Sequence, residues 1–372
     1  MVPELFELWP ALRERLPHVA LGSFPTPIQA LAGVQRALEA ESEETPRAPR
    51  VPALYVKRDD LSSPVYGGNK VRTLEVLMGV ALARGAREIV ATGAFGSNHA
   101  VATVLHAPRV ALVPRVILFP QPHSFAALEN ARVSATHAAH FLALPHWSLL
   151  PYAMWRVGAP ERYVMAPGGA VPEGALGYVA AGLELALQVR GGELPLPSRV
   201  YVGVGSTCTS AGLLVGFRHA ERLGIWKKAP LLVSVRVTPW PVTSRLRILR
   251  LATRAAALLN ELSVGRAPGL TPQELGPGLS IDGRELGAGY GRPSFAGARA
   301  TELVTRVSDL RLDTTYTAKS MSGFLRAARA ASDGPGPFVY WATKSSAALP
   351  DPIDLAKAGL SPGFRRWLAA CR

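Results

Sequence analysis

The chain has 372 residues, of which 48% are hydrophobic and 18% are charged. This length exceeds one ordinary hydrophobic core and predicts two domains, and the hydrophobic content excludes an intrinsically disordered chain. The formal net charge is +14, but the basic residues are dispersed along the chain without a Lys/Arg run, which argues against a nucleic-acid partner and suits an anionic substrate or cofactor.

Predicted strands alternate with predicted helices along most of the chain. Apolar runs and alternating patterns predict strands at residues 51–57, 87–91, 115–120, 161–167, 198–205, 231–238 and 338–343. Helical spacing of apolar residues predicts helices from residue 70 onward and at residues 100–107, 126–139, 175–189, 213–224, 244–264 and 300–310. Such alternation is typical of an α/β protein in which helices cover both faces of parallel sheets. The polar stretch at residues 41–50 is expected to be an exposed insertion.

Cysteine use and hydropathy bear on the compartment. Cys208 and Cys371 form no CxxC pair, and no Cys/His cluster has the spacing of metal ligands, so we expect no metal and a reducing compartment. The N-terminus lacks the pattern of a signal peptide, and no stretch approaches about 20 uninterrupted apolar residues. The sequence therefore predicts a cytoplasmic protein without a membrane partner.

Ligands of such folds bind beyond the carboxyl ends of the strands, and three loops at such positions carry chemistry. The first reads GGNK and ends at Lys70. Only seven of the 41 basic residues are lysines, and a lysine amine, unlike a guanidinium, becomes a nucleophile when burial makes it neutral. Taken alone, a lysine behind two glycines is better explained as a surface residue after a turn.

The second loop reads TGAFGSNH and places Ser97, Asn98 and His99 at a predicted helix start. The free N–H groups of a helix start bind a carboxylate, aided by a serine or asparagine side chain. Serine and asparagine are also preferred helix caps, so capping alone would explain the pattern. A single histidine is more often structural than catalytic.

The third loop reads VGVGSTCTSAG, with small and hydroxylated residues between a strand and a helix. Its free N–H groups would hold a phosphate dianion, with additional donors from Ser206, Thr207, Thr209 and Ser210. The loop lacks the Gly-Lys-Ser/Thr of a P-loop and the third glycine of a dinucleotide fingerprint, which argues against a nicotinamide oxidoreductase. An ordinary strand-to-helix turn is the alternative.

The three loops are more informative together than separately, because they fall at one end of one α/β protein. An amino acid and a phosphorylated aldehyde cofactor would use an amine nucleophile, a carboxylate site and a phosphate site at once. Pyridoxal 5′-phosphate is such an aldehyde, and proteins hold it as a Schiff base on lysine. We therefore predict a pyridoxal-phosphate enzyme that acts on an amino acid.

These loops, together with KRDDL, FPQP, PGGAVPEGALGY, GAGYG and DTTYTAKSM, resemble the D-cysteine desulfhydrase and 1-aminocyclopropane-1-carboxylate deaminase family over residues 20–350. The resemblance implies a tryptophan-synthase-β-like fold (fold type II) of two open, mostly parallel twisted sheets flanked by helices. It implies a discontinuous large cofactor-binding domain (residues 1–75 and 192–372), a small α/β domain (residues 76–191) and an active site between them. It also implies a homodimer with a small amino-acid substrate.

The resemblance further implies roles for single residues in the first two loops. Lys70 matches the Schiff-base lysine, which also moves the Cα proton. Ser97, Asn98 and His99 match the segment that receives the substrate carboxylate, and Asn98 would also face the 3′-oxygen of the cofactor.

Other positions match the cofactor pocket of the family. The residues that match the phosphate loop are Gly205, Ser206, Thr207, Cys208, Thr209 and Ser210. Tyr290 and Tyr316 match two active-site tyrosines, Thr343 lies in a segment next to the cofactor ring, and Thr317 matches the position that faces the pyridine nitrogen. The deaminase branch has glutamate at the last position and the desulfhydrase branch has threonine. A neutral partner should leave the pyridine less protonated and the ring a weaker electron sink.

Three departures from the family pattern concern the cofactor. Desulfhydrases read GSGGTHAGL in the phosphate loop, and Thr207 and Cys208 replace two glycines that would allow positive φ and close approach. Thr73 stands where a lysine often adds charge near the phosphate. Residues 342–345 read ATKS, which includes Lys344, where the family often shows HTGG.

The function expected from these features is α,β-elimination of a small amino acid such as D-cysteine, giving a 2-keto acid and ammonia. Lys70 would act as base, Ser97 would help to hold the carboxylate, and Tyr290 and Tyr316 would orient the substrate or move protons. One alternative is 1-aminocyclopropane-1-carboxylate deamination, against which Thr317 counts. Another is a non-catalytic binding protein, to which the altered phosphate loop and ATKS segment would point.

Overall fold

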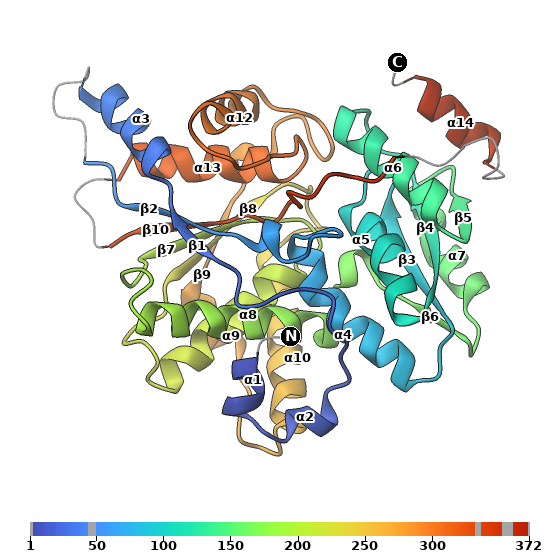
Figure 1. Cartoon of the computed structure of the whole chain (residues 1–372), viewed down its shortest axis with the longest axis horizontal. Helices are drawn as coiled ribbons and strands as arrows, with labels where there is room; N and C mark the ends of the chain where they lie inside the picture. Colours follow the sequence, from blue (N-terminus) through green and yellow to red (C-terminus); the bar gives the residue numbers. More distant parts are fainter. Residues whose placement is uncertain (1–2, 44–49, 332–335, 352–359, 371–372) are drawn as a thin grey trace.

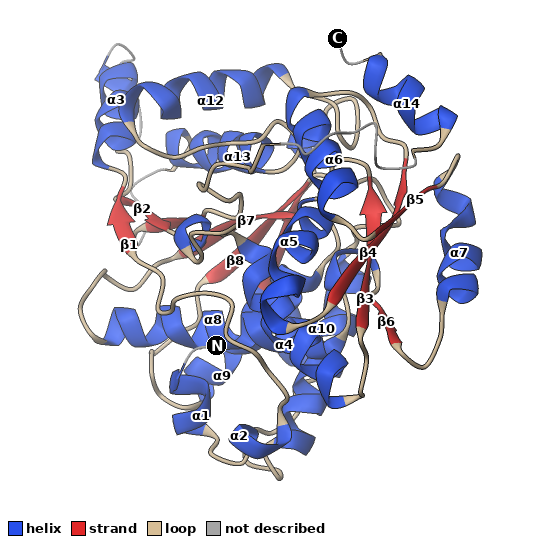
Figure 2. Cartoon of the chain, turned by 45° about the vertical axis from the view of Figure 1, so that its right-hand side comes forward, coloured by secondary structure: helices blue, strands red, loops and turns tan. Residues whose placement is uncertain are grey.

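The computed structural model describes residues 3–43, 50–331, 336–351 and 360–370. Two open, mostly parallel sheets flanked by helices lie beside each other (Figures 1 and 2), which confirms the predicted fold class. Residues 44–49 of the expected insertion, and Cys371, lie outside the described residues.

The larger sheet has six strands in the order β1-β2-β10-β7-β8-β9. They are β1 (Ile28–Ala30), β2 (Leu54–Lys57), β7 (Arg199–Val204), β8 (Leu231–Arg236), β9 (Leu279–Asp282) and β10 (Phe338–Trp341). Neighbours run parallel except β1 and β2. Every residue of β10 is buried, which explains its continuous apolar sequence, because both faces of a parallel sheet are covered.

Helices form a layer on each face of this sheet (Figure 1). One layer contains α8 (Pro172–Arg190), α9 (Cys208–Arg222) and α10 (Arg245–Leu262), joined by the short helices α1 (Pro3–Leu8), α2 (Leu12–Arg15) and α11 (Pro272–Leu275). The other contains α3 (Ala32–Glu43), α12 (Phe295–Val307) and α13 (Thr317–Arg329). Successive side chains of a strand point to opposite faces, so Val200 and Val202 join the first core and Tyr201 joins the second.

The smaller sheet has four parallel strands in the order β5-β4-β3-β6. They are β3 (Glu88–Ala94), β4 (Val113–Phe119), β5 (His140–Ala143) and β6 (Arg162–Val164). On one face Ile89 packs with α4 (Asn69–Ala83), α5 (Asn98–His106) and α6 (Phe125–His137). On the other face Val90 packs with α7 (Leu150–Val157). The C-terminal helix α14 (Pro362–Ala369) joins the first of these cores through Phe364 and Trp367, whose rings contact Phe95.

Two helices pack against the sheet of the other predicted domain. α8 falls within residues 76–191, yet its side chains Leu176, Tyr178 and Leu183 are buried in the core of the larger sheet. α14 falls within residues 192–372, yet its aromatic rings belong to the core of the smaller sheet. We therefore propose a small domain that ends before Pro172 and includes α14.

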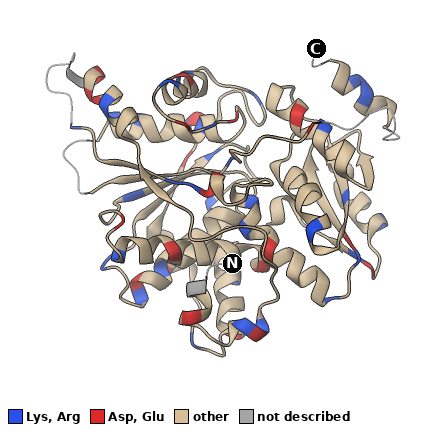
Figure 3. Ribbon diagram, in the orientation of Figure 1, with Lys and Arg blue, Asp and Glu red and all other residues tan. Residues whose placement is uncertain are grey.

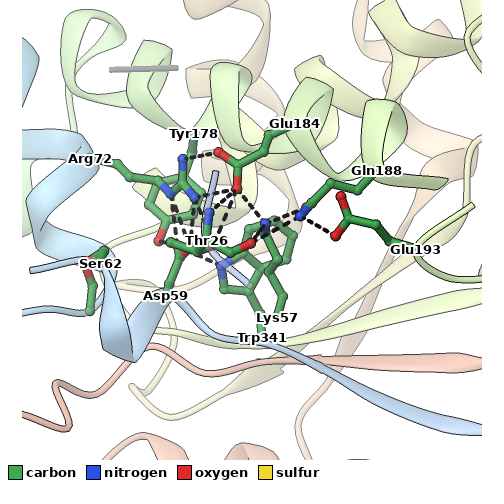
Figure 4. A network of polar contacts seen from close by, with 11 residues as sticks. Thr26, Lys57, Asp59, Ser62, Arg72, Tyr178, Glu184, Gln188, Glu193 and Trp341 are labelled. Atoms are coloured by element: carbon green, nitrogen blue, oxygen red, sulfur yellow. Dashed lines mark hydrogen bonds and ion pairs between the residues drawn. The ribbon is translucent and has the colours of Figure 1, made fainter. Parts of the chain in front are cut away.

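A network of buried charges ties α4 to α8 and to the larger sheet (Figure 4). Arg72 of α4 donates to the carboxylates of Asp59 and Glu184, at closest distances of 2.8 and 2.9 Å. Lys57 of β2 also pairs with Glu184. All four side chains are at most 1% exposed, and their two positive and two negative charges balance. Since Arg72 follows Lys70 by two residues, the network fixes the helix that carries this lysine.

Positive charge is spread over the molecule. In Figure 3, Lys and Arg are scattered among helices, strands and loops around both sheets. No helix within the described ranges is long and apolar enough to cross a membrane.

Candidate active site

Two glycines position Lys70 at the start of α4. A Cβ atom on Gly67 would lie 2.3 Å from the carbonyl oxygen of Asp60, and one on Gly68 would lie 2.4 Å from that of Thr343. Gly68 also has a φ of +90°, which residues with side chains rarely adopt. The glycine pair thus lets the chain pass between two other segments, so that α4 begins directly afterwards with Lys70 in its first turn.

The amine of Lys70 lies where loops from the two sheets meet. Its Nζ donates a hydrogen bond of 3.1 Å to the carbonyl oxygen of Gly168. Gly168 lies against the phosphate-loop candidate, since a Cβ atom on it would be 2.5 Å from Ser206 Oγ. Burial lowers the pKa of Lys70, and the neutral amine is the form that attacks an aldehyde.

Asn98 follows the cap residue Ser97, whose hydroxyl accepts a hydrogen bond from the first turn of α5. The side-chain oxygen of Asn98 accepts hydrogen bonds from Tyr66 Oη (2.9 Å), Asn130 Nδ2 (2.8 Å) and Lys344 Nζ (3.3 Å). Three donors around one atom identify it as the amide oxygen. The Nδ2 group donates to no other atom of the described residues, so it is left as a donor for a ligand.

His99 is buried at the same helix start, with 2% of its surface exposed. Within the described ranges, neither ring nitrogen has a hydrogen-bond partner. Burial, with a smaller effect of the Lys70 charge, lowers the pKa of His99 to about 3. A neutral imidazole with two unpaired nitrogens is unusual inside a protein. Such a side chain is available to form hydrogen bonds with a ligand.

We expect His99 to make the folded chain sensitive to acid. Its pKa of about 3 lies below the ordinary value of 6.5, so between these values only the unfolded state binds the proton. The free energy of unfolding should therefore fall by about 1.4 kcal/mol per pH unit on this account as the pH drops from about 6 to 4. When the free energy of unfolding of His99→Asn is measured with urea at several pH values, it should not show this dependence on pH. The control is His140→Asn, which removes an exposed histidine, and a slope unchanged in His99→Asn would contradict the assignment.

The segment from Gly205 to Ser210 leads from β7 into α9, as the phosphate-site prediction requires. The first N–H groups of α9 have no partner within the helix. Asn69, the residue before Lys70, donates through Nδ2 to Thr209 Oγ1 at 3.0 Å. This hydrogen bond links the phosphate-loop candidate to the residue next to the reactive amine.

Two side chains of this loop point into the interior instead. Cys208 is fully buried, and its thiol donates to the carbonyl oxygen of Gly169 at 3.2 Å. Ser210 is also fully buried, and its hydroxyl accepts a hydrogen bond of 2.9 Å from Ser234 of β8. These side chains anchor the loop, so a phosphate would rest on backbone N–H groups and on the hydroxyls of Ser206 and Thr209.

Thr207 adopts a backbone conformation that favours glycine. Its φ is +76°, in the left-handed region, so the loop has a bend that a glycine would adopt more readily. A residue with a Cβ atom adopts this region at a cost of about 1–2 kcal/mol. We expect Thr207→Gly to raise the free energy of unfolding by about 1 kcal/mol, measured by urea unfolding. Thr253→Gly, in the interior of α10, should instead lower it by about 0.3 kcal/mol. A lower free energy of unfolding in Thr207→Gly would show that the backbone of Thr207 is not strained.

Tyr290 and Tyr316 form a contacting pair. Their hydroxyl oxygens are 2.9 Å apart, and their rings meet edge to face. Burial raises the pKa of Tyr290 to about 12 and the pKa of Tyr316 well above its ordinary value, so both phenols stay protonated near neutral pH. A Cβ atom on Gly205 would be 2.9 Å from the Tyr316 ring, so the pair lies beside the phosphate-loop candidate.

Thr317 lies in the first turn of α13, and its hydroxyl is engaged by Asp313. It accepts the N–H of Asp313 at 2.6 Å and donates to the Asp313 carboxylate at 2.9 Å. The same carboxylate also accepts the N–H groups of Thr315 and Tyr316 in the turn that precedes the helix. Since its proton is committed to Asp313, Thr317 could offer a ring nitrogen only a lone pair. We infer that Asp313 would favour a protonated ring nitrogen, contrary to the expectation for threonine alone.

Thr343, which the resemblance placed next to the cofactor ring, contributes its carbonyl oxygen, which accepts the N–H of Asn69 at 3.1 Å. Other residues of this site were not singled out from the sequence. Tyr66 lies directly before the GGNK loop, and Asp313 is the first residue of the DTTYTAKSM motif. These positions in the sequence were the only signals that marked the two residues. Asn130 lies in a helix that showed apolar periodicity alone, so no signal marked it.

The residues present fit pyridoxal phosphate. A lysine amine of lowered pKa, an unpaired buried imidazole and two helix starts with free N–H groups lie on linked loops. These are the groups needed for an aldehyde, a carboxylate and a phosphate. The fold and the site together define a pyridoxal-phosphate enzyme of fold type II.

Comparison with known proteins gives the same class. Residues 20–343 match the family "Pyridoxal-phosphate dependent enzyme", and the chain belongs to this family. It is 32% identical over 343 residues to nocardicin C-9′ epimerase of Nocardia uniformis subsp. tsuyamanensis, which covers 89% of this chain and 93% of that protein. It is 30% identical over 351 residues to D-cysteine desulfhydrase of Salmonella paratyphi C, covering 88% and 94%. The crystal structure of an ACC deaminase homologue superimposes over 100% of both chains, with a TM-score of 0.71 and 26% identity.

Proposed function

We propose that the chain catalyses β-elimination on a small amino acid, with D-cysteine as the first candidate substrate. The balanced reaction converts D-cysteine and water into pyruvate, ammonia and hydrogen sulfide. The observation that carries this proposal is the position of Lys70. Its amine of lowered pKa lies next to loops that lead into α5 and α9, and the protonated phenols of Tyr290 and Tyr316 lie at the same edge.

Each group has one task in this reaction. Pyridoxal phosphate, when bound, supplies an aldehyde for amines and a ring that withdraws electrons. Lys70 would hold the cofactor and, once the substrate amine has displaced it, take the Cα proton as general base, which requires a lowered pKa. The start of α5 would bind the carboxylate and so orient the Cα–H bond toward Lys70. The phenols of Tyr290 and Tyr316 would give a proton to the departing sulfur.

The test is an assay of the protein loaded with pyridoxal phosphate. With D-cysteine we expect sulfide and pyruvate in equal amounts, and with L-cysteine a lower rate. Formation of 2-oxobutyrate from 1-aminocyclopropane-1-carboxylate would instead identify the deaminase. Failure to turn over D-cysteine and related β-substituted amino acids would reject the elimination.

Epimerisation at Cα is a second candidate, and the 32% identity to nocardicin C-9′ epimerase favours it. It would share the removal of the Cα proton by Lys70 and differ in returning a proton to the opposite face. In D2O an epimerase would incorporate deuterium at Cα and give both configurations without a keto acid. The lyase would release the keto acid.

A non-catalytic binding protein would purify without cofactor and stay colourless when pyridoxal phosphate is added. One argument for it was the loss of glycine at Thr207. The positive φ of that residue counts against this argument, because the threonine still adopts a conformation that glycine favours. The homodimer that the resemblance implies stays a prediction, which sedimentation equilibrium would test.

A further inference from the structure

Lys344 is a second lysine beside the site, and it follows β10 in the segment that departs from the family pattern. Its Nζ donates to Tyr66 Oη at 3.2 Å and to Asn98 Oδ1 at 3.3 Å, and it lies 5.3 Å from the centre of the Tyr66 ring. Both acceptors are neutral. No carboxylate oxygen of the described residues lies within 4.0 Å of this amine.

The charged form of this amine is favoured. Burial alone would lower the pKa of Lys344, but Tyr66 and the more distant carboxylates of Asp313 and Glu129 raise it above its ordinary value. A partly buried ammonium without a paired anion is unfavourable, and a bound anion would relieve this cost. The charge is therefore accounted for if a ligand brings a negative oxygen.

The position of Lys344 indicates where that oxygen would lie. The hydrogen bond to Asn98 places the ammonium at the start of α5, where the first N–H groups are unpaired and the helix dipole favours negative charge. His99, buried with two unpaired ring nitrogens, belongs to the same helix start. The start of α5 thus carries an ammonium from the segment after β10 and an unpaired imidazole from its own first turn.

We propose that Lys344 binds a negatively charged oxygen of the ligand at the start of α5 and determines the specificity of this site. The proposal rests on the proposed action on amino acids. Two sources can supply such an oxygen, namely the carboxylate of the substrate and the ring oxygen of pyridoxal phosphate. In the first case Lys344 selects ligands that have a carboxylate, and in the second it keeps the ring oxygen ionised.

The test uses the full chain loaded with pyridoxal phosphate and four variants. Lys344→Met and Lys344→Gln remove the charge, Lys344→Arg keeps it, and Lys227→Met removes an exposed lysine as the control. One readout is the midpoint of the visible absorbance change with pH in the absence of substrate. The other is the affinity for both enantiomers of alanine and of alaninamide, measured by the spectral change on binding. Alanine has no leaving group on Cβ, and alaninamide has no carboxylate.

If the substrate supplies the oxygen, loss of the charge should weaken alanine binding about tenfold or more and leave alaninamide binding and the absorbance midpoint unchanged. If the cofactor supplies it, the midpoint should move by about one unit or more to higher pH, and alanine and alaninamide should change equally. Lys344→Arg should stay within about threefold of the wild type, because the charge remains.

The proposal is overturned if folded Lys344→Met or Lys344→Gln matches Lys227→Met in both readouts, with thermal unfolding confirming the fold. A wild type that binds no alanine would reject the substrate as source, and the absorbance midpoint alone would then decide. Absence of sulfide and pyruvate in the assay above would reject the elimination without altering either readout, so the two failures are distinguishable.

Discussion

Replacing Lys70 by arginine should abolish covalent attachment of pyridoxal phosphate and lower turnover by about 10²–10⁴-fold. A guanidinium stays protonated and cannot attack the aldehyde, whereas burial lowers the pKa of the Lys70 amine toward its reactive neutral form. Arginine preserves the charge and much of the length of the side chain, so the variant tests the chemistry of the amine. Borohydride reduction followed by peptide mass spectrometry should find one added cofactor on the wild-type peptide that contains Lys70 and none in Lys70→Arg.

The control is Lys227→Arg, the same replacement at an exposed lysine, which should retain both attachment and turnover. Lys344 is another amine beside the site. If the cofactor were found on Lys344, or if Lys70→Arg kept its colour through dialysis and lost it on reduction, the role assigned to Lys70 would be wrong.

The arrangement of the fold was predictable because its signals are local and repeated. The strand at residues 198–205 and the helix at residues 175–189 are long, apolar and bounded by turn residues, and both occur within two or three residues of β7 and α8. β1, β5 and β9 gave no comparable signal, since each has only three or four residues and a partly exposed sequence. Such short strands are defined by pairing with a neighbour, which a local pattern does not contain.

The candidate site was predictable only for residues that stand at ends of elements. Lys70, Ser97 and Asn98 lie at helix starts, where turn residues and free N–H groups are visible in sequence. Asn130 and Gly168 reach the site from segments 32 and 98 residues away from their partners, so their roles depend on the packing of whole elements.

The backbone of Thr207 could not be derived from its residue type. Threonine disfavours positive φ, yet the surrounding contacts hold the loop in the left-handed region. Cys208 supplies one of these contacts through its hydrogen bond to Gly169. Local propensity is overridden here by packing, as happens at positions where function needs a particular backbone shape.

Replacing Glu184 by glutamine should lower the free energy of unfolding by about 3–5 kcal/mol. Although burial alone would raise the pKa of Glu184, the charges of Arg72 and Lys57 hold it below its ordinary value. The pairing is therefore present at neutral pH and is lost as the pH falls through the folded pKa. Glutamine keeps the shape but leaves two buried cations with Asp59 alone. Guanidinium unfolding measures the loss.

The matched control is Glu41→Gln. Its partner is Arg329, and the two side chains are 48% and 45% exposed. Water and salt screen such a pair, so its removal should change the free energy of unfolding by about 0–1 kcal/mol. If both variants lost a similar amount of unfolding free energy, burial would not determine how much the network contributes to stability.

A double variant separates charge imbalance from lost hydrogen bonds. Lys57→Met combined with Glu184→Gln removes one cation and one anion, so Arg72 and Asp59 remain as a balanced pair at 2.8 Å. If the uncompensated charge causes the loss, the double variant should be more stable than Glu184→Gln alone. If the hydrogen bonds dominate, the losses of the two single variants should add. In the first outcome, the network would stabilise the fold only while its charges balance. This would explain why Lys57 and Glu184 occur together next to Arg72, in the helix that carries Lys70.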